Sequence, residues 1–311
     1  MKSSATMPAK VAEYLAHRRS LGYALKAEGL LLAGFARYTE RLGHRGPLTL
    51  ELALRWARQP AGAHPTYWAR RLGVVRGLAK YLRLQEPSTE VPDTRLLGPV
   101  CRRKTPHIYS REEILQLLRN AERGPRRKGL PSHTISMVIG LLAVTGMRIS
   151  EVLHLQCNDV DWNNRVLTVR EAKFHKARLI PLHATTVAKL AQYAQERHRF
   201  FPKARSFFVS RRGTPLSYDT VRLIFHQLVK GIAPRGAYPR PRLHDLRHAF
   251  ACRTLTRWSK RPVTLDQRML FLMHYLGHTQ IRHTYWYLSA IPELLARAAV
   301  HFEHYANALE P

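Results

Sequence analysis

The chain has 311 residues, and 45% of them are hydrophobic, so we expect two folded domains with a sizeable core, and the chain is too apolar to be disordered. Its 51 Lys and Arg residues outnumber its 21 Asp and Glu residues, which gives a net charge of +30 and a pI near 11.0. This excess predicts a polyanionic partner, most often nucleic acid, although a ribosomal-type or membrane-surface protein would share it.

The cysteines and the N-terminal segment indicate the compartment. Cys101, Cys157 and Cys252 are far apart and form neither a CxxC pair nor a disulfide framework, which is typical of a reducing compartment. No apolar run approaches the roughly 18 residues that a membrane span needs, and MKSSATMPAKVAEYLAHRR lacks the apolar core of a signal peptide. We therefore expect a cytoplasmic protein that stays with the nucleoid DNA and has no membrane partner.

Residues 1–90 predict a helical domain. Apolar residues recur there at spacings of three and four, as on the buried face of a helix. One stripe is Leu31, Phe35, Tyr38 and Leu42, before Gly43, and a second is Trp68, Leu72, Val75, Ala79 and Leu82.

Cations without acids accompany the second stripe, and further cations occur in the segment after it. Residues 64–83 contain no Asp or Glu, and the pattern then breaks over 86–106, where four prolines indicate a linker that we place at 91–108. These cations either lie on a solvated helix face or contact a DNA backbone. The candidates for DNA contact are Arg70, Arg71, Arg76, Lys80, Arg102, Arg103 and Lys104.

Residues 109–311 predict a second domain that is mainly α with a small β-sheet. Ser110 and Glu113 form a capping-box pattern, and TISMVIGLLAVTG over 134–146 predicts a buried helix that ends at Gly146. Strand-like segments at 165–170 and 177–182 predict a β-hairpin joined by EAKFHK. Further helices are predicted at about 184–198, 217–230, 244–257 and 264–275.

The ionisable residues of this second domain suit chemistry on a phosphodiester without a metal. Residues 241–290 contain only Asp245 and Asp266 as acids, against eight Lys and Arg, so paired carboxylates for divalent ions are missing there. The 17 histidines include no HExxH motif or Cys/His ligand set, and we expect no metal and no cofactor. Phosphate charge would then be stabilised by cationic side chains.

Two short strings place arginines where they could bind phosphate. In TGMRISE, Arg148 can clamp two phosphate oxygens, and Glu151 lies one helical turn further on, where it could hold the guanidinium. By itself, this pair is more often an ordinary surface i,i+3 pair. In HDLRH, a helix would present His244 and Arg247 on one face, as would a DNA-binding helix without catalysis.

These strings, followed by LGHTQIRHTYWYLSA, resemble the tyrosine recombinases of the integrase and Xer class. The resemblance implies that Tyr287, nine residues after His278, is the nucleophile, with Tyr285 and Tyr305 as rivals. By itself, a tyrosine in an aromatic string such as TYWY is more often part of a core. The implied catalytic residues are Arg148, Lys173, His244, Arg247, His278 and Tyr287, with Glu151 and His248 in support. Lys173, with Lys176 as the next candidate, would be the mobile hairpin lysine that protonates the leaving 5′ oxygen.

The resemblance also implies a fold and a reaction. The fold is a two-domain clamp around double-stranded DNA, with an N-terminal helical bundle and an α+β catalytic domain. The reaction is cleavage and rejoining through a 3′-phosphotyrosine, without ATP or metal, by a homotetramer on two DNA sites or by an assembly with related recombinase subunits. The alternatives are a catalytically silent DNA-binding protein of this fold and a type IB topoisomerase. From Pro292, an apolar stripe of Leu295, Ala299, Phe302 and Ala306 predicts a C-terminal helix that packs on its own domain or docks on a neighbouring protomer.

Overall fold

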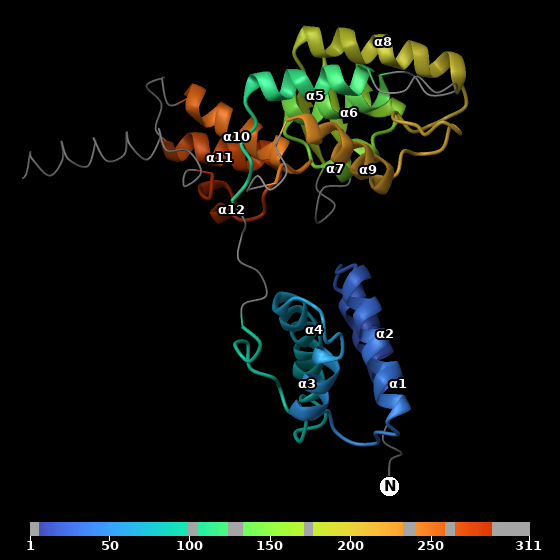
Figure 1. Ribbon diagram of the computed structural model, residues 1–311, viewed down its shortest axis with the longest axis vertical. Coiled ribbons are helices and arrows are strands. Elements are labelled where there is room, and N and C mark those ends of the chain that lie inside the picture. The colour runs from blue at the N-terminus through green and yellow to red at the C-terminus, as the bar shows by residue number, and fades with distance from the viewer. Residues whose placement is uncertain are drawn as a thin grey trace, which may run out of the picture. The chain divides into compact units, whose positions relative to one another are not determined.

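A computed structural model of the chain describes residues 6–98, 105–123, 133–170, 177–232, 240–258 and 265–287 (Figure 1). The chain divides into two compact units, Met1–Arg103 and Lys104–Pro311. Within the described residues, no helix combines the length and the apolar character that crossing a membrane requires.

The described part of the N-terminal unit, residues 6–98, contains four helices around one apolar core. They are α1 (Met7–Ser20), α2 (Lys26–Arg41), α3 (Leu50–Arg58) and α4 (Pro65–Leu82). The helices that both apolar stripes predict are confirmed as α2 and α4, and Gly43 follows the end of α2 with a φ of 63°. Most of the stripe residues lie in the core, whereas Leu42 is 48% exposed and Trp68 is partly exposed. In this core Phe35 of α2 meets Trp56 of α3 edge to face.

Arg71 lies in this core instead of on the surface with Arg70 and Lys80. Its guanidinium stacks 3.7 Å from the ring centroid of Trp56 and donates to the Trp56 carbonyl at 2.7 Å. The position follows from the stripe, because Arg71 adjoins the buried Leu72 and its aliphatic stem packs among apolar neighbours. Arg71 therefore stabilises the bundle from inside.

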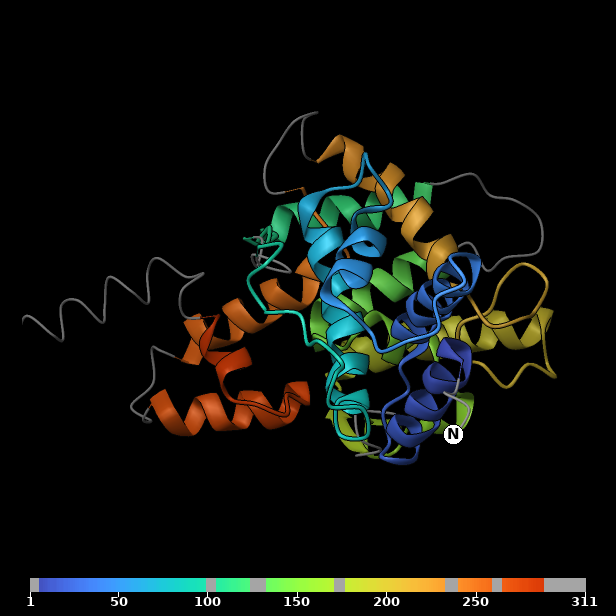
Figure 2. The same ribbon diagram turned by 90° about the horizontal axis from the view of Figure 1, so that it is seen from below.

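The C-terminal unit surrounds the buried helix α6 (Thr134–Thr145) with further helices and a small sheet. Two of these helices come before the sheet in the sequence, α5 (Arg111–Arg123) and α7 (Ile149–Leu153). The helices that follow the sheet are α8 (Ala184–Phe200), α9 (Tyr218–Leu228), α10 (Asp245–Trp258), α11 (Leu265–Leu276) and α12 (Arg282–Tyr285). Short 3-10 turns occur at Cys157–Asp159 and Val229–Gly231. In Figure 2 the orange and red helices α10, α11 and α12 lie together.

The sheet has three antiparallel strands in the order β1-β2-β3, with β1 at Val160–Asp161, β2 at Val166–Val169 and β3 at Arg178–Pro181. The predicted hairpin is confirmed as β2 and β3, whose last register pair is Val169 with Arg178. The sequence did not reveal β1, because two residues are too few to show an alternating pattern.

The predicted helix boundaries reflect local hydrogen bonds. At the start of α5 the capping box is confirmed, since Ser110 N–H donates to Glu113 Oε2 at 2.8 Å and Glu113 N–H donates to Ser110 Oγ at 3.1 Å. At the end of α6, Gly146 takes a φ of 63° and its N–H donates to the Leu142 carbonyl at 3.0 Å. A Cβ at Gly146 would lie 2.4 Å from Cδ1 of Phe250, so α10 packs directly on this turn.

We expect Gly146→Ala to lower the free energy of unfolding of the C-terminal unit by about 2 kcal/mol or more, because it adds both a steric overlap and a left-handed non-glycine residue. The matched control is Gly43→Ala, which has the same φ of 63° but open space around its Cβ, and should cost about 1 kcal/mol. Hydrogen exchange in urea reports each unit separately. Equal losses for the two variants would show that Phe250 yields without cost.

Candidate active site

The C-terminal end of α11 is the point on which the candidate site converges. Gly277 has a φ of 66° and its N–H donates to the His274 carbonyl, while the His278 N–H donates to the Met273 carbonyl, each at 3.0 Å. This pattern is a Schellman motif, which satisfies two of the carbonyls at a helix end. The carbonyls of Tyr275, Leu276 and Gly277 still need donors.

Three arginines from separate elements supply those donors. Arg178 Nε donates to the Tyr275 carbonyl at 2.9 Å, Arg247 Nη2 to the Leu276 carbonyl at 2.7 Å, and Arg148 Nη2 to the Gly277 carbonyl at 2.9 Å. Cations are favoured at this end of a helix because the macrodipole places partial negative charge there. The three guanidinium groups are thereby brought together at the three consecutive carbonyls that precede His278.

Glu151 supplies the negative charge beneath this cluster. Its side chain is only 3% exposed, and its carboxylate accepts from Arg148 Nη1 at 2.8 Å and from Arg178 Nη1 and Nη2 at 2.9 and 2.7 Å. Burial alone would raise the pKa of Glu151, but the hydrogen bonds and charge of Arg178, followed by those of Arg148, lower the pKa to about 2. The carboxylate is therefore ionised and holds two guanidinium groups in fixed orientations.

The turn between α6 and α7 aims Arg148 at the cluster. Arg148 is the residue before α7, and its backbone N–H donates to Glu151 Oε2 at 2.8 Å. The Gly146 carbonyl of the same turn accepts from Arg247 Nη1 at 2.8 Å. The pair of Arg148 and Glu151 is thus part of a largely buried network and not an ordinary surface pair, and the carboxylate holds the guanidinium as the first of the two interpretations expects.

Arg247 is enclosed by protein, whereas Arg148 is partly open to solvent. Arg247 is 2% exposed, and burial lowers its pKa to about 10, so it remains a cation at neutral pH. The Arg148 side chain is 29% exposed. A guanidinium carries five N–H donors. The Arg148 guanidinium donates once to the Gly277 carbonyl and once to the Glu151 carboxylate, so further N–H groups are left toward solvent.

Two of the predicted histidines flank these arginines. Burial and the adjacent charge of Arg247 lower the pKa of His244 to about 4, although solvent reaches its ring, and burial, Arg247 and Arg148 lower the pKa of His278 to about 3. Both imidazoles are neutral at neutral pH. The His278 Nδ1 lies 2.9 Å from Oγ1 of Thr284, which is fully buried in α12.

Tyr287 lies two residues after the end of α12, beside the rings of His278 and His248. Its ring centroid is 6.0 Å from that of His278 and 5.4 Å from that of His248, and it is 2% exposed within an apolar cluster of α10 and α11. Burial raises the pKa of the Tyr287 phenol, and the charge of Arg247 opposes that rise. Tyr285 is exposed instead, so the structure separates the two tyrosines by burial and by neighbours.

Several predicted residues fall outside the described part of the chain. They are Lys173 and its neighbour Lys176, the linker cations Arg102, Arg103 and Lys104, the rival Tyr305, and the predicted C-terminal helix from Pro292. The strands on either side of Lys173 end at Val169 and begin at Arg178.

Arg178 is a residue of this site that the sequence motifs did not indicate. Strand alternation turns Arg178 and the buried Ile180 to one face, while Leu179 is 65% exposed. The signal available in the sequence was that Arg178 lies two residues before Ile180 in the second predicted strand, so both side chains lie on the same face of that strand. Because Leu179 and Ile180 are both apolar, the sequence alone does not fix which phase faces inward.

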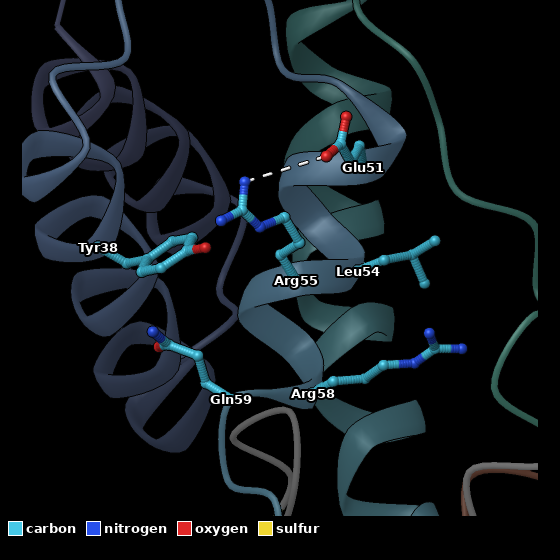
Figure 3. A pocket seen from close by; sticks show the side chains of 6 residues that line it. All are labelled: Tyr38, Glu51, Leu54, Arg55, Arg58 and Gln59. Atoms are coloured by element: carbon cyan, nitrogen blue, oxygen red, sulfur yellow. Dashed lines mark ion pairs between the residues drawn. The ribbon is translucent and has the colours of Figure 1, made fainter.

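A hollow of about 510 Å³ lies elsewhere, in the N-terminal unit between α2 and the end of α3 (Figure 3). Tyr38 faces Arg55 across it, and Arg55 is paired with Glu51 at 3.9 Å. Both members of this pair are well exposed to solvent. The hollow offers no convergence of buried cations, so we assign the candidate site to the end of α11.

The donor set at α11 favours an oxyanion over a metal ion. Among the described residues, no group of three or more His, Cys, Asp or Glu side chains is close enough to hold a metal. Glu151 is engaged by two arginines, while the cations around it outnumber it. The arrangement can hold a phosphate next to a tyrosine.

Comparison with known proteins places these residues in a family. The sequence profile of the phage integrase family matches residues 109–293, which include the whole candidate site. The putative integrase/recombinase y4rB of Sinorhizobium fredii is 38% identical over 296 residues, covering 93% of this chain and 94% of that protein. The tyrosine recombinase XerD of Caulobacter vibrioides is 31% identical over 241 residues, covering 76% of this chain and 74% of that protein.

Solved structures agree on the fold. The Tn1549 transposon integrase in complex with transposon right end DNA superimposes with a TM-score of 0.67 at 19% identity, covering 96% of this chain and 99% of that one. The XerH site-specific recombinase bound to its difH substrate gives a TM-score of 0.66 at 18% identity, covering 97% and 91%. The expected mainly helical fold with a small sheet is confirmed.

We expect Glu151→Gln to lower the free energy of unfolding by about 3 kcal/mol, because it leaves two guanidinium groups without their buried counter-charge. The control is Glu51→Gln, which removes a carboxylate from the exposed pair with Arg55 and should change stability by less than about 1 kcal/mol. Urea unfolding followed by circular dichroism measures both. A loss below 1 kcal/mol for Glu151→Gln would mean that the helix carbonyls alone hold the arginines.

Proposed function

We propose, since this chain belongs to the phage integrase family and is a site-specific tyrosine recombinase, that Tyr287 is its nucleophile and that the cluster at the end of α11 binds the scissile phosphate. The observation that carries the proposal is the convergence of Arg148, Arg247 and His278 on one helix end beside Tyr287. The relatives are recombinases and integrases, so neither a silent DNA-binding protein nor a topoisomerase is favoured.

The proposed reaction exchanges one phosphate ester for another. The phenol of Tyr287 releases its proton to solvent water, and its oxygen forms a bond to phosphorus as the bond from phosphorus to the 5′ oxygen breaks, which leaves a 3′-phosphotyrosine and a 5′ hydroxyl. Lys173 gives a proton to the departing 5′ oxygen. Attack by the 5′ hydroxyl of another strand reverses these steps, so the ester bond energy is retained and no nucleotide is consumed.

The cationic side chains stabilise charge on the phosphate during that exchange. Arg148 and Arg247 donate to the nonbridging oxygens, and His244 and His278 add neutral N–H donors. Glu151 and Arg178 orient Arg148 without touching the phosphate, and His248 supports the ring of Tyr287. Phosphate bound beside Tyr287 completes the environment that favours attack by the phenol.

We infer that the partner is double-stranded DNA, which both units contact through basic side chains. The N-terminal contacts are Arg70, Arg76 and Lys80, of which Arg70 and Lys80 are exposed, and Arg71 is left out because it is buried. The linker contacts are Arg102, Arg103 and Lys104. These N-terminal and linker cations would neutralise DNA phosphates, so the affinity for DNA that they contribute would fall as the salt concentration rises.

Recombination between two sites would require a homotetramer, with the enzyme acting in the cytoplasm on nucleoid DNA. Support comes from a protein of similar fold, since one chain of a lambda integrase tetramer bound to a Holliday junction superimposes on this chain with a TM-score of 0.61. The predicted C-terminal helix would link neighbouring protomers in such an assembly.

We expect Tyr287→Phe to abolish covalent attachment to a nicked suicide substrate while DNA affinity stays within about twofold, because cations supply the binding. Tyr285→Phe is the matched control, two residues away and exposed, and should retain attachment. Denaturing gels detect the adduct, and titrations with labelled DNA measure affinity. An adduct formed by Tyr287→Phe but not by Tyr285→Phe would assign the nucleophile to Tyr285.

We expect cleavage to keep its rate in EDTA and without nucleotide, because guanidinium and imidazole groups, and not carboxylate-bound ions, face the phosphate. The measurement is the rate of adduct formation on the suicide substrate, with and without chelator. Loss of the adduct in EDTA and its return with magnesium would contradict the mechanism.

A further inference from the structure

Thr284 connects the two reacting sides of the site. Its Oγ1 lies 2.9 Å from His278 Nδ1, and its backbone carbonyl accepts from the Tyr287 N–H at 3.0 Å. The residue is 0% exposed, so water does not compete for its hydroxyl. One side chain thus touches the imidazole, while its main chain holds the residue that carries the phenol.

The protonation state of His278 determines what the hydrogen bond between its Nδ1 and the Thr284 hydroxyl does to the ring. The ring is flanked by Arg148, Arg247, His244 and His283, and burial together with these groups lowers its pKa to about 3. At neutral pH the ring therefore carries a single proton, on either Nδ1 or Nε2. The partner of one nitrogen decides whether the other is a donor or an acceptor.

A phosphate dictates which tautomer is useful. Its nonbridging oxygens are acceptors only, so they can pair with an Nε2–H but not with an Nε2 lone pair. A threonine hydroxyl can donate or accept, and donation to Nδ1 is the arrangement that leaves the proton on Nε2. The opposite arrangement, in which Nδ1–H donates to Thr284, would leave Nε2 as an acceptor that could receive a proton from a phenol.

We propose that Thr284 is a positioning residue, whose hydroxyl donates to His278 Nδ1 and so keeps the proton on Nε2, directed at the scissile phosphate. The assignment of Nε2 to the phosphate rests on the proposed function, whereas the tautomer itself does not. Because Thr284 also anchors Tyr287 through its carbonyl, the same residue sets the imidazole and the nucleophile relative to each other.

Cleavage rates test the role in the reaction. In single-turnover cleavage of a suicide substrate by the full chain, we expect Thr284→Val to slow the rate about 10-fold to 100-fold, because it preserves shape but removes the donor. Thr284→Ser keeps the hydroxyl and should recover most of the rate. Thr279→Val, a substitution at an exposed threonine next to His278, is the matched control and should cleave like the unaltered protein.

A double-mutant cycle separates positioning from structure. If Thr284 acts through His278, Thr284→Val has little further effect in a His278→Ala background. An equal loss in both backgrounds would overturn the proposal, because it would show that the hydroxyl serves the fold and not the imidazole.

The tautomer can be measured without any cleavage. In protein labelled with ring ¹⁵N histidine, the His278 signals are those that disappear in His278→Gln. We expect a protonated Nε2 and an unprotonated Nδ1, and a shift toward the other tautomer in Thr284→Val but not in Thr284→Ser. A protonated Nδ1 in the unaltered protein would overturn the proposal. If His278→Ala cleaves at the normal rate, His278 does not donate to the phosphate and that part of the proposed function is wrong. The claim that Thr284 sets the tautomer of His278 is then tested by the ¹⁵N spectrum alone.

Discussion

The end of α11 is the constraint on which the site depends. A helix that stops inside a protein leaves carbonyl groups that must find donors, and here the Schellman turn satisfies only part of them. Arg148, Arg178 and Arg247 take the remaining carbonyls, although they come from the α6–α7 turn, from β3 and from α10. The need to complete one helix end therefore gathers three guanidinium groups where a phosphate can meet them.

The same solution recurs elsewhere in this basic chain. With 51 Lys and Arg against 21 Asp and Glu, carboxylates cannot pair with every cation of the chain, and several interior arginines bind carbonyl groups instead. Arg71 donates to the Trp56 carbonyl near the end of α3, Arg253 to Ala143 near the end of α6, and Arg268 to Trp258 at the end of α10. Such contacts place a cation against the negative end of a helix dipole. At α11 they also serve the proposed chemistry, and Glu151 supplies the buried negative charge that keeps Arg148 and Arg178 in place.

Tyr287, the proposed nucleophile, lies among imidazole rings and apolar side chains beside that helix end. Tyr287 is enclosed by apolar residues of α10 and α11 and by imidazole rings, which raises the pKa of its phenol. The phenol is thus protonated before DNA arrives, and Arg247 is the group that works against this effect. Both interpretations of the aromatic string TYWY hold in part, since Tyr287 is at once a core residue and a neighbour of the cation cluster.

The sequence by itself determined the elements and the residue types of the site. Apolar spacing predicted α2, α4 and α6, the Ser110 and Glu113 pair predicted the start of α5, and the motif strings named Arg148, Arg247, His278 and Tyr287. These signals are local, because a helix period, a cap or a short motif is written within a few neighbouring residues. Tertiary structure decided what depends on distant partners: that Arg71 is buried against Trp56, that Arg178 joins Glu151 from 27 residues away, and that Thr284 meets His278. Strand phase and the route of the chain bring those side chains together, and neither is fixed by the residues adjacent to them.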